Sequence, residues 1–325
     1  MNSRPSNELC SANIKAEAQR LGFFACGIAQ AHAVSEDVAK AFEQWVSDGG
    51  YADMDYMARN IDKRLHPDRL MPGVKSIISV ALNYASSVKW QAESYEIATY
   101  ALGRDYHEVM KQKLRSLATA LGLREMRMDE PLPQDGQAHC RVFCDTAPVL
   151  ERYWAVEAGL GWTGRNHQLI VPHAGSMFFL GELFVDVELD YDKPQPNRCG
   201  TCHRCEQACP TGAIGAGNIH FNASKCLSWA TIENKGDIEP QMAATMGQCI
   251  YGCDRCQKAC PWNRFAQPNT TAELQPKTEL QSMTKTDWQT LTEEHYRSLF
   301  SHSAVKRAKY VGLMRNIKAA DKPTN

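Results

Sequence analysis

Two cysteine runs constrain this chain more than any other feature of its sequence. The first begins at Cys199 and ends at Cys209, followed by proline, with the spacing C-x2-C-x2-C-x3-C-P. The second begins at Cys253 and ends at Cys260, also followed by proline, with the spacing C-x2-C-x3-C-P. Thiolates this close together can bind neighbouring metal atoms of one site. The region must therefore fold so that these sulfurs surround metal.

The spacing of the first run is typical of bacterial proteins that hold two 4Fe–4S clusters. In such runs the three closely spaced cysteines bind one cluster, and the cysteine before proline binds the other. One run of this kind predicts a second, and the second lies about fifty residues further on. Crossed ligation predicts that the first cluster is held by Cys199, Cys202, Cys205 and Cys260. The predicted ligands of the second cluster include Cys209, Cys253 and Cys256.

The second cluster needs one more ligand, and two cysteines are candidates. Cys249 lies four residues before Cys253, which departs from the x2 spacing. Cys226 follows a loop-like stretch, residues 221–225, that can fold back toward the run. Spacing alone does not decide between them.

Zinc and disulfides are the alternative explanations for these cysteines. Zinc ribbons also use C-x2-C pairs, but a zinc site stops at four ligands and has no need of the x3-C-P extension. Disulfide frameworks belong to short secreted domains, whereas this chain has 325 residues. Its first residues contain no apolar stretch typical of a signal peptide. We therefore expect iron–sulfur chemistry in the reducing cytoplasm.

Composition and charge are those of an ordinary globular protein. Hydrophobic residues make up 43% and charged residues 22%, and no apolar run reaches the roughly 18 residues of a membrane span. The formal net charge of −1 gives no evidence for a nucleic-acid partner. Basic residues do gather near the C-terminus, where they form either a solvated helix face or a set of phosphate contacts. The candidates for phosphate contact are Lys306, Arg307 and Arg315.

Hydrophobic periodicity and turn residues predict alternating helices and strands before the cysteine runs. We expect helices over residues 7–21, 35–48, 106–121 and 148–158. We expect strands over residues 75–84 and 139–144, and a hairpin formed by 168–171 and 177–185. This pattern predicts an α/β domain over residues 1–190. A Pro-rich linker then leads to a cluster module over 191–268, and a helical segment follows over 269–325.

A glycine motif, Gly159-x-Gly161-x-x-Gly164, matches the dinucleotide-binding fingerprint in letters only. The fingerprint requires a preceding strand and a following helix, but here a predicted helix comes first. We therefore reject a Rossmann site, although glycines can let the backbone approach a bulky cofactor closely.

Asp145 follows a predicted strand and precedes a predicted helix. An aspartate at such a place commonly caps the helix, yet α/β proteins also place reacting groups at strand ends. The nearby Cys140 and Cys144 are expected to be small buried hydrophobic residues. The segment Arg104-Asp-Tyr-His107 is a polar stretch that opens a helix.

Several segments together resemble epoxyqueuosine reductases. They are Tyr100-Ala-Leu-Gly-Arg-Asp-Tyr-His107, Asp145-Thr-Ala-Pro-Val-Leu-Glu-Arg152, Gly159-Leu-Gly-Trp-Thr-Gly-Arg-Asn166, Gly175-Ser-Met-Phe-Phe-Leu-Gly-Glu182, Cys226-Leu-Ser-Trp-Ala-Thr-Ile-Glu233 and both cysteine runs. The resemblance spans roughly residues 20–316. It implies a cobalamin-dependent oxidoreductase of tRNA maturation, which reduces epoxyqueuosine to queuosine at the wobble position of the anticodon.

The resemblance also implies a fold and a set of site residues. The fold is a cobalamin-binding α/β (α+β) domain, akin to reductive dehalogenases, joined to a ferredoxin-like module with two 4Fe–4S clusters and a short helical C-terminal segment. The family's proton donor falls on Asp145, and its eighth cluster ligand on Cys226. The candidate cobalamin contacts are Arg104, Asp105, Tyr106, His107, Arg141, Gly161, Trp162, Arg165, Asn166, Gly175 and Ser176.

The implied partners are the anticodon stem-loop of a tRNA with a GUN anticodon and a low-potential electron donor such as flavodoxin or ferredoxin. No membrane partner is expected, and the protein is expected to be a monomer. Family members often have Ile and Lys where this chain has Thr163 and Arg165, and many continue beyond Asn316 into a helical-repeat tail. The alternatives are a reductive dehalogenase of a small organohalide and a non-catalytic ferredoxin-like electron carrier.

Overall fold

The computed structural model describes residues 9–88, 90, 94–215 and 221–321. These residues form two compact units, and neither unit is one continuous stretch of chain. The first unit contains Met1–Gln44, Arg59–Asn83 and His107–Gly200. The second contains Trp45–Ala58, Tyr84–Tyr106 and Thr201–Asn325. The predicted linear boundaries at 190 and 268 therefore do not account for residues 45–58 and 84–106, which belong with the cysteine-rich part.

The first unit is built on a five-stranded sheet with the order β1-β2-β8-β5-β4. All neighbouring strands are antiparallel except β4 and β5, which are parallel. The two long central strands are rich in β-branched and aromatic residues, which favour the pleated conformation. The strands are β1 (Ala25–Gln30), β2 (Ser76–Asn83), β4 (Arg124–Glu125), β5 (His139–Phe143) and β8 (Phe178–Val185).

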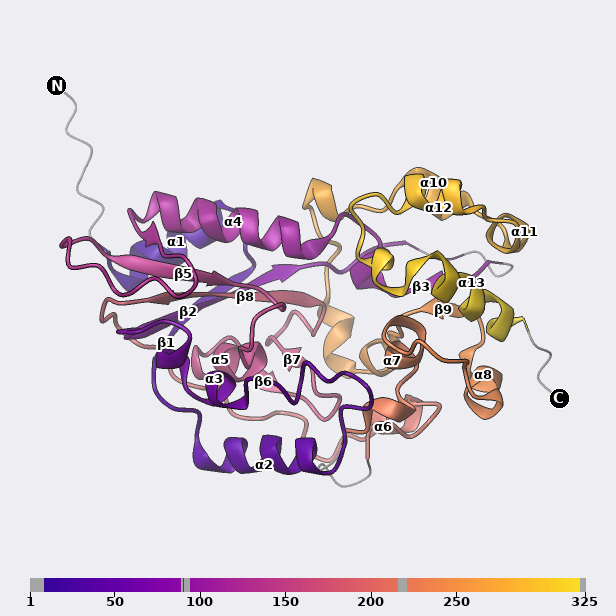
Figure 1. The fold of residues 1–325 in the computed structure, drawn as a ribbon, viewed down its shortest axis with the longest axis horizontal. Coiled ribbons are helices and arrows are strands. Elements are labelled where there is room, and N and C mark those ends of the chain that lie inside the picture. The colour runs from indigo at the N-terminus through magenta and orange to yellow at the C-terminus, as the bar shows by residue number, and fades with distance from the viewer. Residues whose placement is uncertain (1–8, 89, 91–93, 216–220, 322–325) are drawn as a thin grey trace. The chain divides into compact units, whose positions relative to one another are not determined.

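Helices cover both faces of this sheet, so its central strands are buried on both sides (Figure 1). A Cβ atom added to Gly181 would approach side chains of Met110 and Leu114, so one face of β8 packs closely against α4. The opposite face carries Phe184 and packs with Trp154 of α5 in one hydrophobic core. The helices of this unit are α1 (Ser11–Arg20), α2 (Glu36–Ser47), α3 (Ile61–Leu65), η1 (Pro67–Arg69), α4 (Tyr106–Ala120) and α5 (Glu151–Glu157).

The predicted strands at 75–84 and 139–144 are confirmed, as are the helices at 35–48 and 106–121. The predicted hairpin is wrong. β7 (Leu169–Ile170) pairs with β6 (Trp162–Thr163), while β8 joins the large sheet. The turn at His173 closes only an isolated bridge between Val171 and Gly175. Local turn residues suggested the wrong partner because strand pairing in β8 is decided by distant segments.

The second unit contains a parallel pair of short strands, β3 (Glu96–Ile97) and β9 (Cys249–Tyr251), surrounded by helices. Its main core is aromatic, with Trp288, Tyr251 and Phe300 almost fully buried. Its α-helices are α6 (Arg204–Ala208), α7 (Leu227–Ile232), α8 (Pro240–Met246), α9 (Arg255–Lys258), α10 (Thr278–Ser282), α11 (Lys285–Gln289), α12 (Glu293–Leu299) and α13 (Lys309–Ala320). Its short 3-10 helices are η2 (Thr99–Ala101), η3 (Ala223–Lys225), η4 (Pro261–Phe265), η5 (Ala272–Leu274) and η6 (Ala304–Ala308).

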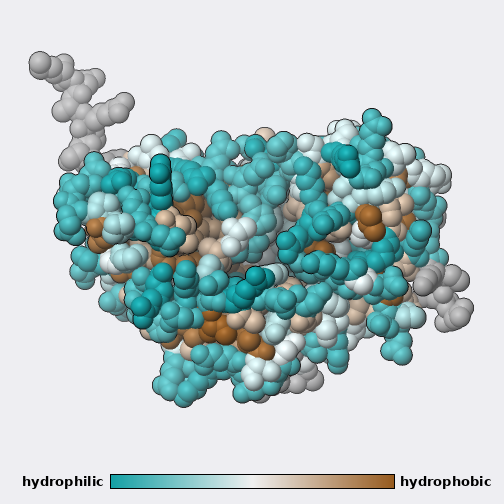
Figure 2. All heavy atoms as spheres, in the orientation of Figure 1, coloured by the Kyte–Doolittle hydropathy of each residue, from teal (hydrophilic) through white to brown (hydrophobic). Residues whose placement is uncertain are grey.

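Hydrophilic side chains occupy most of the face drawn in Figure 2, and hydrophobic residues form only small areas between them. Among the described residues, none of the helices has the length and the apolar character needed to cross a bilayer.

Candidate functional site

Asp145 lies in a tight turn directly after strand β5. Its backbone has a φ of 58°, in the left-handed region that aspartate and asparagine tolerate better than most residues. Helix α5 starts six residues later, and its N-cap position is Leu150. Asp145 is therefore not the cap of this helix, and the helix-capping role considered for it in the sequence analysis is wrong. Its backbone N–H instead donates a hydrogen bond to the side chain of Glu151.

The carboxyl group of Asp145 contacts a histidine from a different element. His107 is the second residue of α4, and its Nε2 lies 2.9 Å from Oδ2 of Asp145. On the same side of the turn, Lys111 Nζ donates to Oγ1 of Thr146 at 3.0 Å. The side chain of Asp145 remains 54% exposed. The turn thus presents a carboxyl group that is oriented by an imidazole and still accessible to a substrate.

Two further acidic residues lie beneath this turn, and sequence analysis assigned neither of them a role. Glu182 is fully buried in β8, and Glu151 is the first residue of α5. Burial and the charge of Asp145 raise the pKa of Glu151 to about 8. Burial and the charge of Glu151 raise the pKa of Glu182 well above its usual range. The signal was present in the sequence, because Glu182 interrupts the otherwise apolar strand FFLGELFV.

The glycine motif is required by the protein's own packing. A Cβ atom on Gly161 would come within 2.0 Å of the carbonyl oxygen of Ile170. One on Gly164 would meet the side chain of the same isoleucine. These glycines let β6 and β7 approach each other, which removes the need to explain them by a cofactor.

Other residues of this loop region remain suitable for contact with a large ligand. Asn166 is buried, and within the described parts of the chain its Nδ2 has no hydrogen-bond partner. Ser176 is buried as well, next to Gly175, whose φ is 89°. Arg165 Nη2 donates to the carbonyl oxygen of Gly200 at 3.0 Å. Trp162, by contrast, is almost fully buried in β6 and contributes to the core.

The remaining candidate contacts are distributed between the two units. Arg141 is buried and donates to the backbone carbonyl oxygens of Leu70 and Glu130, so its guanidinium serves the fold. Arg104, Asp105 and Tyr106 belong to the second unit. There the backbone N–H groups of Arg104 and Asp105 donate to the carbonyl oxygens of Glu273 and His302.

Within the second unit, four of the predicted ligands surround one another. Burial raises the pKa of Cys256, and the charges of Cys253, Cys226, Cys209 and Cys205 raise it further. The same factors act on Cys226, where burial is joined by the charges of Cys253 and Cys209. Cys256, Cys253 and Cys209 are the three ligands that crossed ligation predicts for one cluster, and Cys226 is the fourth ligand that the family resemblance implies. Cys205 in turn lies near Cys260, its predicted partner in the other cluster.

The two candidates for the eighth ligand differ in their surroundings. Cys249 is buried in β9, where its Sγ donates to the carbonyl oxygen of Gly252 at 2.5 Å and also interacts with the thiol of Cys253. Cys226 stands directly before α7, among the cysteines of its predicted cluster. Within the described residues, no three His, Cys, Asp or Glu side chains converge on a single ion. The thiolates of a cubane each bind a different iron atom, so their sulfurs need not converge in that way.

The basic residues near the C-terminus mostly stabilise the fold. Arg315 donates to the carbonyl oxygens of Ala230, Asn234 and Gly236 at 2.6–2.9 Å. Arg307 forms a two-point ion pair with Glu233. Because Arg315 is occupied by backbone carbonyl groups, the prediction that it contacts phosphate is corrected. Lys306 is exposed and remains available for that role.

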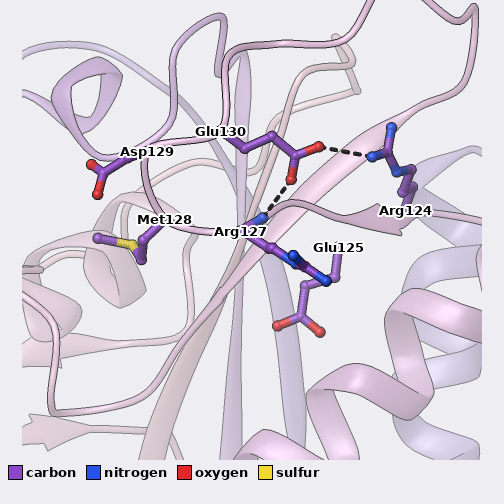
Figure 3. A pocket seen from close by; sticks show the side chains of 6 residues that line it. All are labelled: Arg124, Glu125, Arg127, Met128, Asp129 and Glu130. Carbon is purple, nitrogen blue, oxygen red and sulfur yellow. Dashed lines mark hydrogen bonds and ion pairs between the residues drawn. The ribbon is translucent and has the colours of Figure 1, made fainter.

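A surface pocket of about 570 Å³ is present in the first unit. Figure 3 shows that its lining comes from one continuous segment, and that Glu130 pairs with Arg124 and with the backbone of Arg127. None of the predicted site residues lines this pocket.

The cysteine spacing, the crossed thiol sets and the accessible acid beside an α/β sheet together define an iron–sulfur oxidoreductase. Residues 198–263 match the family model of the 4Fe-4S double cluster binding domain, which confirms the prediction of two 4Fe–4S clusters. Residues 64–146 match the model described as epoxyqueuosine reductase QueG, DUF1730.

Full-length relatives identify the family. The chain is 41% identical to the epoxyqueuosine reductase of Cellulophaga algicola, over 94% of this chain and 95% of that protein. It is 37% identical to the epoxyqueuosine reductase of Escherichia coli, over 94% of this chain and 79% of that protein. The chain belongs to the epoxyqueuosine reductase family, as its motifs predicted.

Solved structures agree with this assignment. A crystal structure of epoxyqueuosine reductase with an epoxyqueuosine-modified tRNA-Tyr stem loop has a TM-score of 0.84 and 26% identity, and the match covers 95% of this chain and 80% of that one. A structure of the Bacillus subtilis enzyme, with its catalytic aspartate loop swung out of the active site, has a TM-score of 0.81 and 25% identity, with the same coverage.

Proposed function

We propose that this chain reduces epoxyqueuosine to queuosine at the wobble position of tRNA, and that Asp145 supplies a proton to the epoxide oxygen. The observation that carries the proposal is the turn after β5. It presents an accessible carboxyl group, held 2.9 Å from His107, in a chain that belongs to the epoxyqueuosine reductase family. Conversion of the epoxide to an alkene consumes two electrons and two protons and releases water.

Cobalamin is the second cofactor in this proposal, and the first unit offers groups suited to it. The buried amide of Asn166 has an Nδ2 donor without a partner in the described structure, which suits the amide oxygens at the rim of a corrin. Ser176 and Asn166 would hold the cofactor, together with the backbone at Gly175. When bound, cobalamin supplies a strongly reducing, nucleophilic metal centre.

The protein's own contribution is the proton and its placement. Breaking a C–O bond leaves negative charge on oxygen, and a positioned acid that protonates it contributes roughly 100- to 10,000-fold in rate. His107 orients the carboxyl group of Asp145. The side chain of Asp145 is 54% exposed here, so a bound cofactor and RNA would have to bury it for the carboxyl group to hold a proton.

The RNA partner is the anticodon stem-loop of a tRNA with a GUN anticodon. A wobble nucleotide is already in a loop, so turning it toward the active site costs little compared with flipping a base from a duplex. Electrons enter through the two 4Fe–4S clusters from a low-potential donor such as flavodoxin or ferredoxin. We further propose that the protein works in the cytoplasm as a monomer.

The test is anaerobic reconstitution with iron, sulfide and cobalamin, followed by an assay on an RNA stem loop that carries the epoxide. The expected result is queuosine, detected by mass spectrometry of the digested RNA, with one alkene formed for every two electrons supplied. A reconstituted protein that binds the stem loop and both cofactors but forms no queuosine would overturn the proposal. Cleavage of an organohalide without binding of the stem loop would indicate a reductive dehalogenase instead.

A further inference from the structure

Glu182 occupies an unusual position for an acidic residue. It lies in the central part of β8 with 0% of its surface exposed, opposite Ser79 of β2 and Phe143 of β5. Within the described residues, neither carboxyl oxygen of Glu182 has a hydrogen-bond partner, and neither does the hydroxyl of Ser79. An unpaired ionised carboxylate in such a place is very costly. Glu182 therefore keeps its proton at neutral pH.

Glu151 connects this buried acid to the turn that carries Asp145. Its side chain points back from the first turn of α5 and accepts the hydrogen bond from the backbone N–H of Asp145. Glu182 interacts electrostatically with Glu151 from the strand beneath. The contact thus joins the catalytic turn to the centre of the sheet through a pair of acids that resist being ionised together.

We propose that Glu151 is a positioning residue for the turn that carries Asp145; this proposal rests on the proposed role of Asp145 as proton donor. The carboxyl group of Glu151 holds the Asp145 turn through the hydrogen bond from the backbone N–H of Asp145, and the strength of that hold depends on whether Glu151 is ionised. Glu151 accepts its hydrogen bond from the backbone N–H of Asp145 and not from a reacting group. It acts on the backbone, and thereby on where the carboxyl group stands relative to His107.

The direction of the pH effect follows from the hydrogen bond. An ionised carboxylate accepts an N–H more strongly than a neutral acid does. With its pKa raised to about 8 by burial and by Asp145, Glu151 is mostly neutral at pH 6.5 and mostly ionised at pH 9.5. The turn is therefore held loosely at the lower pH and firmly at the higher. The charged groups that act on Glu151 are Asp145 from the turn, Arg152 from its own helix and His107 from α4. The charge of Glu151 in turn acts on the buried acid Glu182 of β8.

Hydrogen exchange of the Asp145 amide measures this contact directly. We would compare the cofactor-loaded wild type with Glu151→Ala, Glu151→Gln and Glu182→Gln, corrected for the intrinsic pH dependence of exchange. Glu157→Ala is the matched control, because this residue lies at the other end of α5, where its carboxylate faces His32 at 3.9 Å. Iron content and the thermal midpoint verify that each variant is folded.

The wild type should show protection of the Asp145 amide that rises between pH 6.5 and 9.5. Loss of the acceptor in Glu151→Ala should reduce protection at pH 9.5 by roughly 10- to 100-fold, the effect of one hydrogen bond to a charged group. Glu151→Gln should restore part of the protection but show no rise with pH. Glu182→Gln should leave the position of the rise unchanged, because a protonated Glu182 places no charge beside Glu151. In turnover, Glu151→Ala should lower kcat about tenfold or more with the KM for RNA unchanged.

The proposal is overturned if Glu151→Ala protects the Asp145 amide as the wild type does, or if the wild type shows no rise with pH. It is also overturned if Glu151→Gln follows the same pH curve as the wild type. The exchange measurement does not depend on turnover. Failure of the proposed function would instead appear as full activity of Asp145→Asn, while the exchange behaviour of the Glu151 variants stays as expected.

Discussion

His107 Nε2 lies 2.9 Å from Asp145 Oδ2, although 38 positions separate the two residues in the sequence. The first stands at the start of α4 and the second in the turn after β5, so the contact exists only because both elements belong to one compact unit. It gives the carboxyl group one preferred orientation while leaving it accessible. This pair is the centre of the candidate active site.

Replacement of the acid should stop the reaction without removing the cofactors. We expect Asp145→Asn to lower kcat by roughly 100-fold or more, because general acid catalysis is lost. Asparagine tolerates a positive φ, so the turn should persist. The measurement is single-turnover formation of queuosine at matched iron and cobalamin content. Asp129→Asn is the control, since that exposed residue also has a positive φ, 63°. Equal loss in both variants would point to a folding defect.

Removal of the histidine should act through the orientation of Asp145. We expect His107→Phe to lower kcat about tenfold, and His107→Gln, which can still donate to the carboxylate, to be affected less. Steady-state kinetics with the RNA stem loop would measure both. A Phe variant as active as the wild type would show that the contact plays no part in turnover.

Substitution of the two candidate eighth ligands should have different effects on iron content. Cys226→Ser should reduce the iron content by about four atoms per chain, the content of one cluster. Cys249→Ser, which removes a thiol that donates to Gly252, should retain about eight atoms. Iron and acid-labile sulfide determination on anaerobically prepared protein would test this. Loss of a cluster from Cys249→Ser alone would reverse the assignment.

The C-terminal basic residues should separate into structural and RNA-binding residues. Arg315→Ala removes donors to three backbone carbonyl groups and should destabilise the fold by roughly 2–4 kcal/mol. Lys306→Ala should leave the thermal midpoint unchanged and reduce the salt dependence of RNA binding by about one ion. Binding titrations at several salt concentrations would measure the slope. An unchanged slope for Lys306→Ala would exclude this lysine from phosphate contact.

The buried acid should make stability fall as pH rises. The pKa of Glu182 is raised in the folded protein, so the folded state holds a proton that the unfolded state has released above its ordinary carboxyl pKa. Stability therefore decreases from about pH 5 upward, until the folded-state pKa is reached. Glu182→Gln should remove part of this decrease. The free energy of unfolding of the variant, measured relative to that of the wild type, should therefore be about 1–2 kcal/mol higher at pH 8 than at pH 6. Thermal midpoints at both pH values would show this, with Glu125→Gln on the exposed strand β4 as control.

Much of the fold could be predicted locally, and the errors have a common cause. Strands β2 and β5 and helices α2 and α4 follow from hydrophobic periodicity. The expected hairpin failed because β8 pairs with β2 and β5, which lie far away in the sequence. The helix expected from Pro148 begins only at Glu151, since residues 145–150 form a non-helical segment. Turn residues indicate where a strand ends, but they do not indicate its partner.

The sequence by itself determined the cofactor chemistry and the family, because ligand spacing and motif order are properties of the chain alone. Only the tertiary structure decided which side chains meet. It placed His107 beside Asp145, Cys226 near Cys209 and Cys253, and Glu182 near Glu151. It also showed that Arg315 binds backbone carbonyl groups. These relationships depend on burial and on contacts between distant segments, and neither is encoded in local spacing.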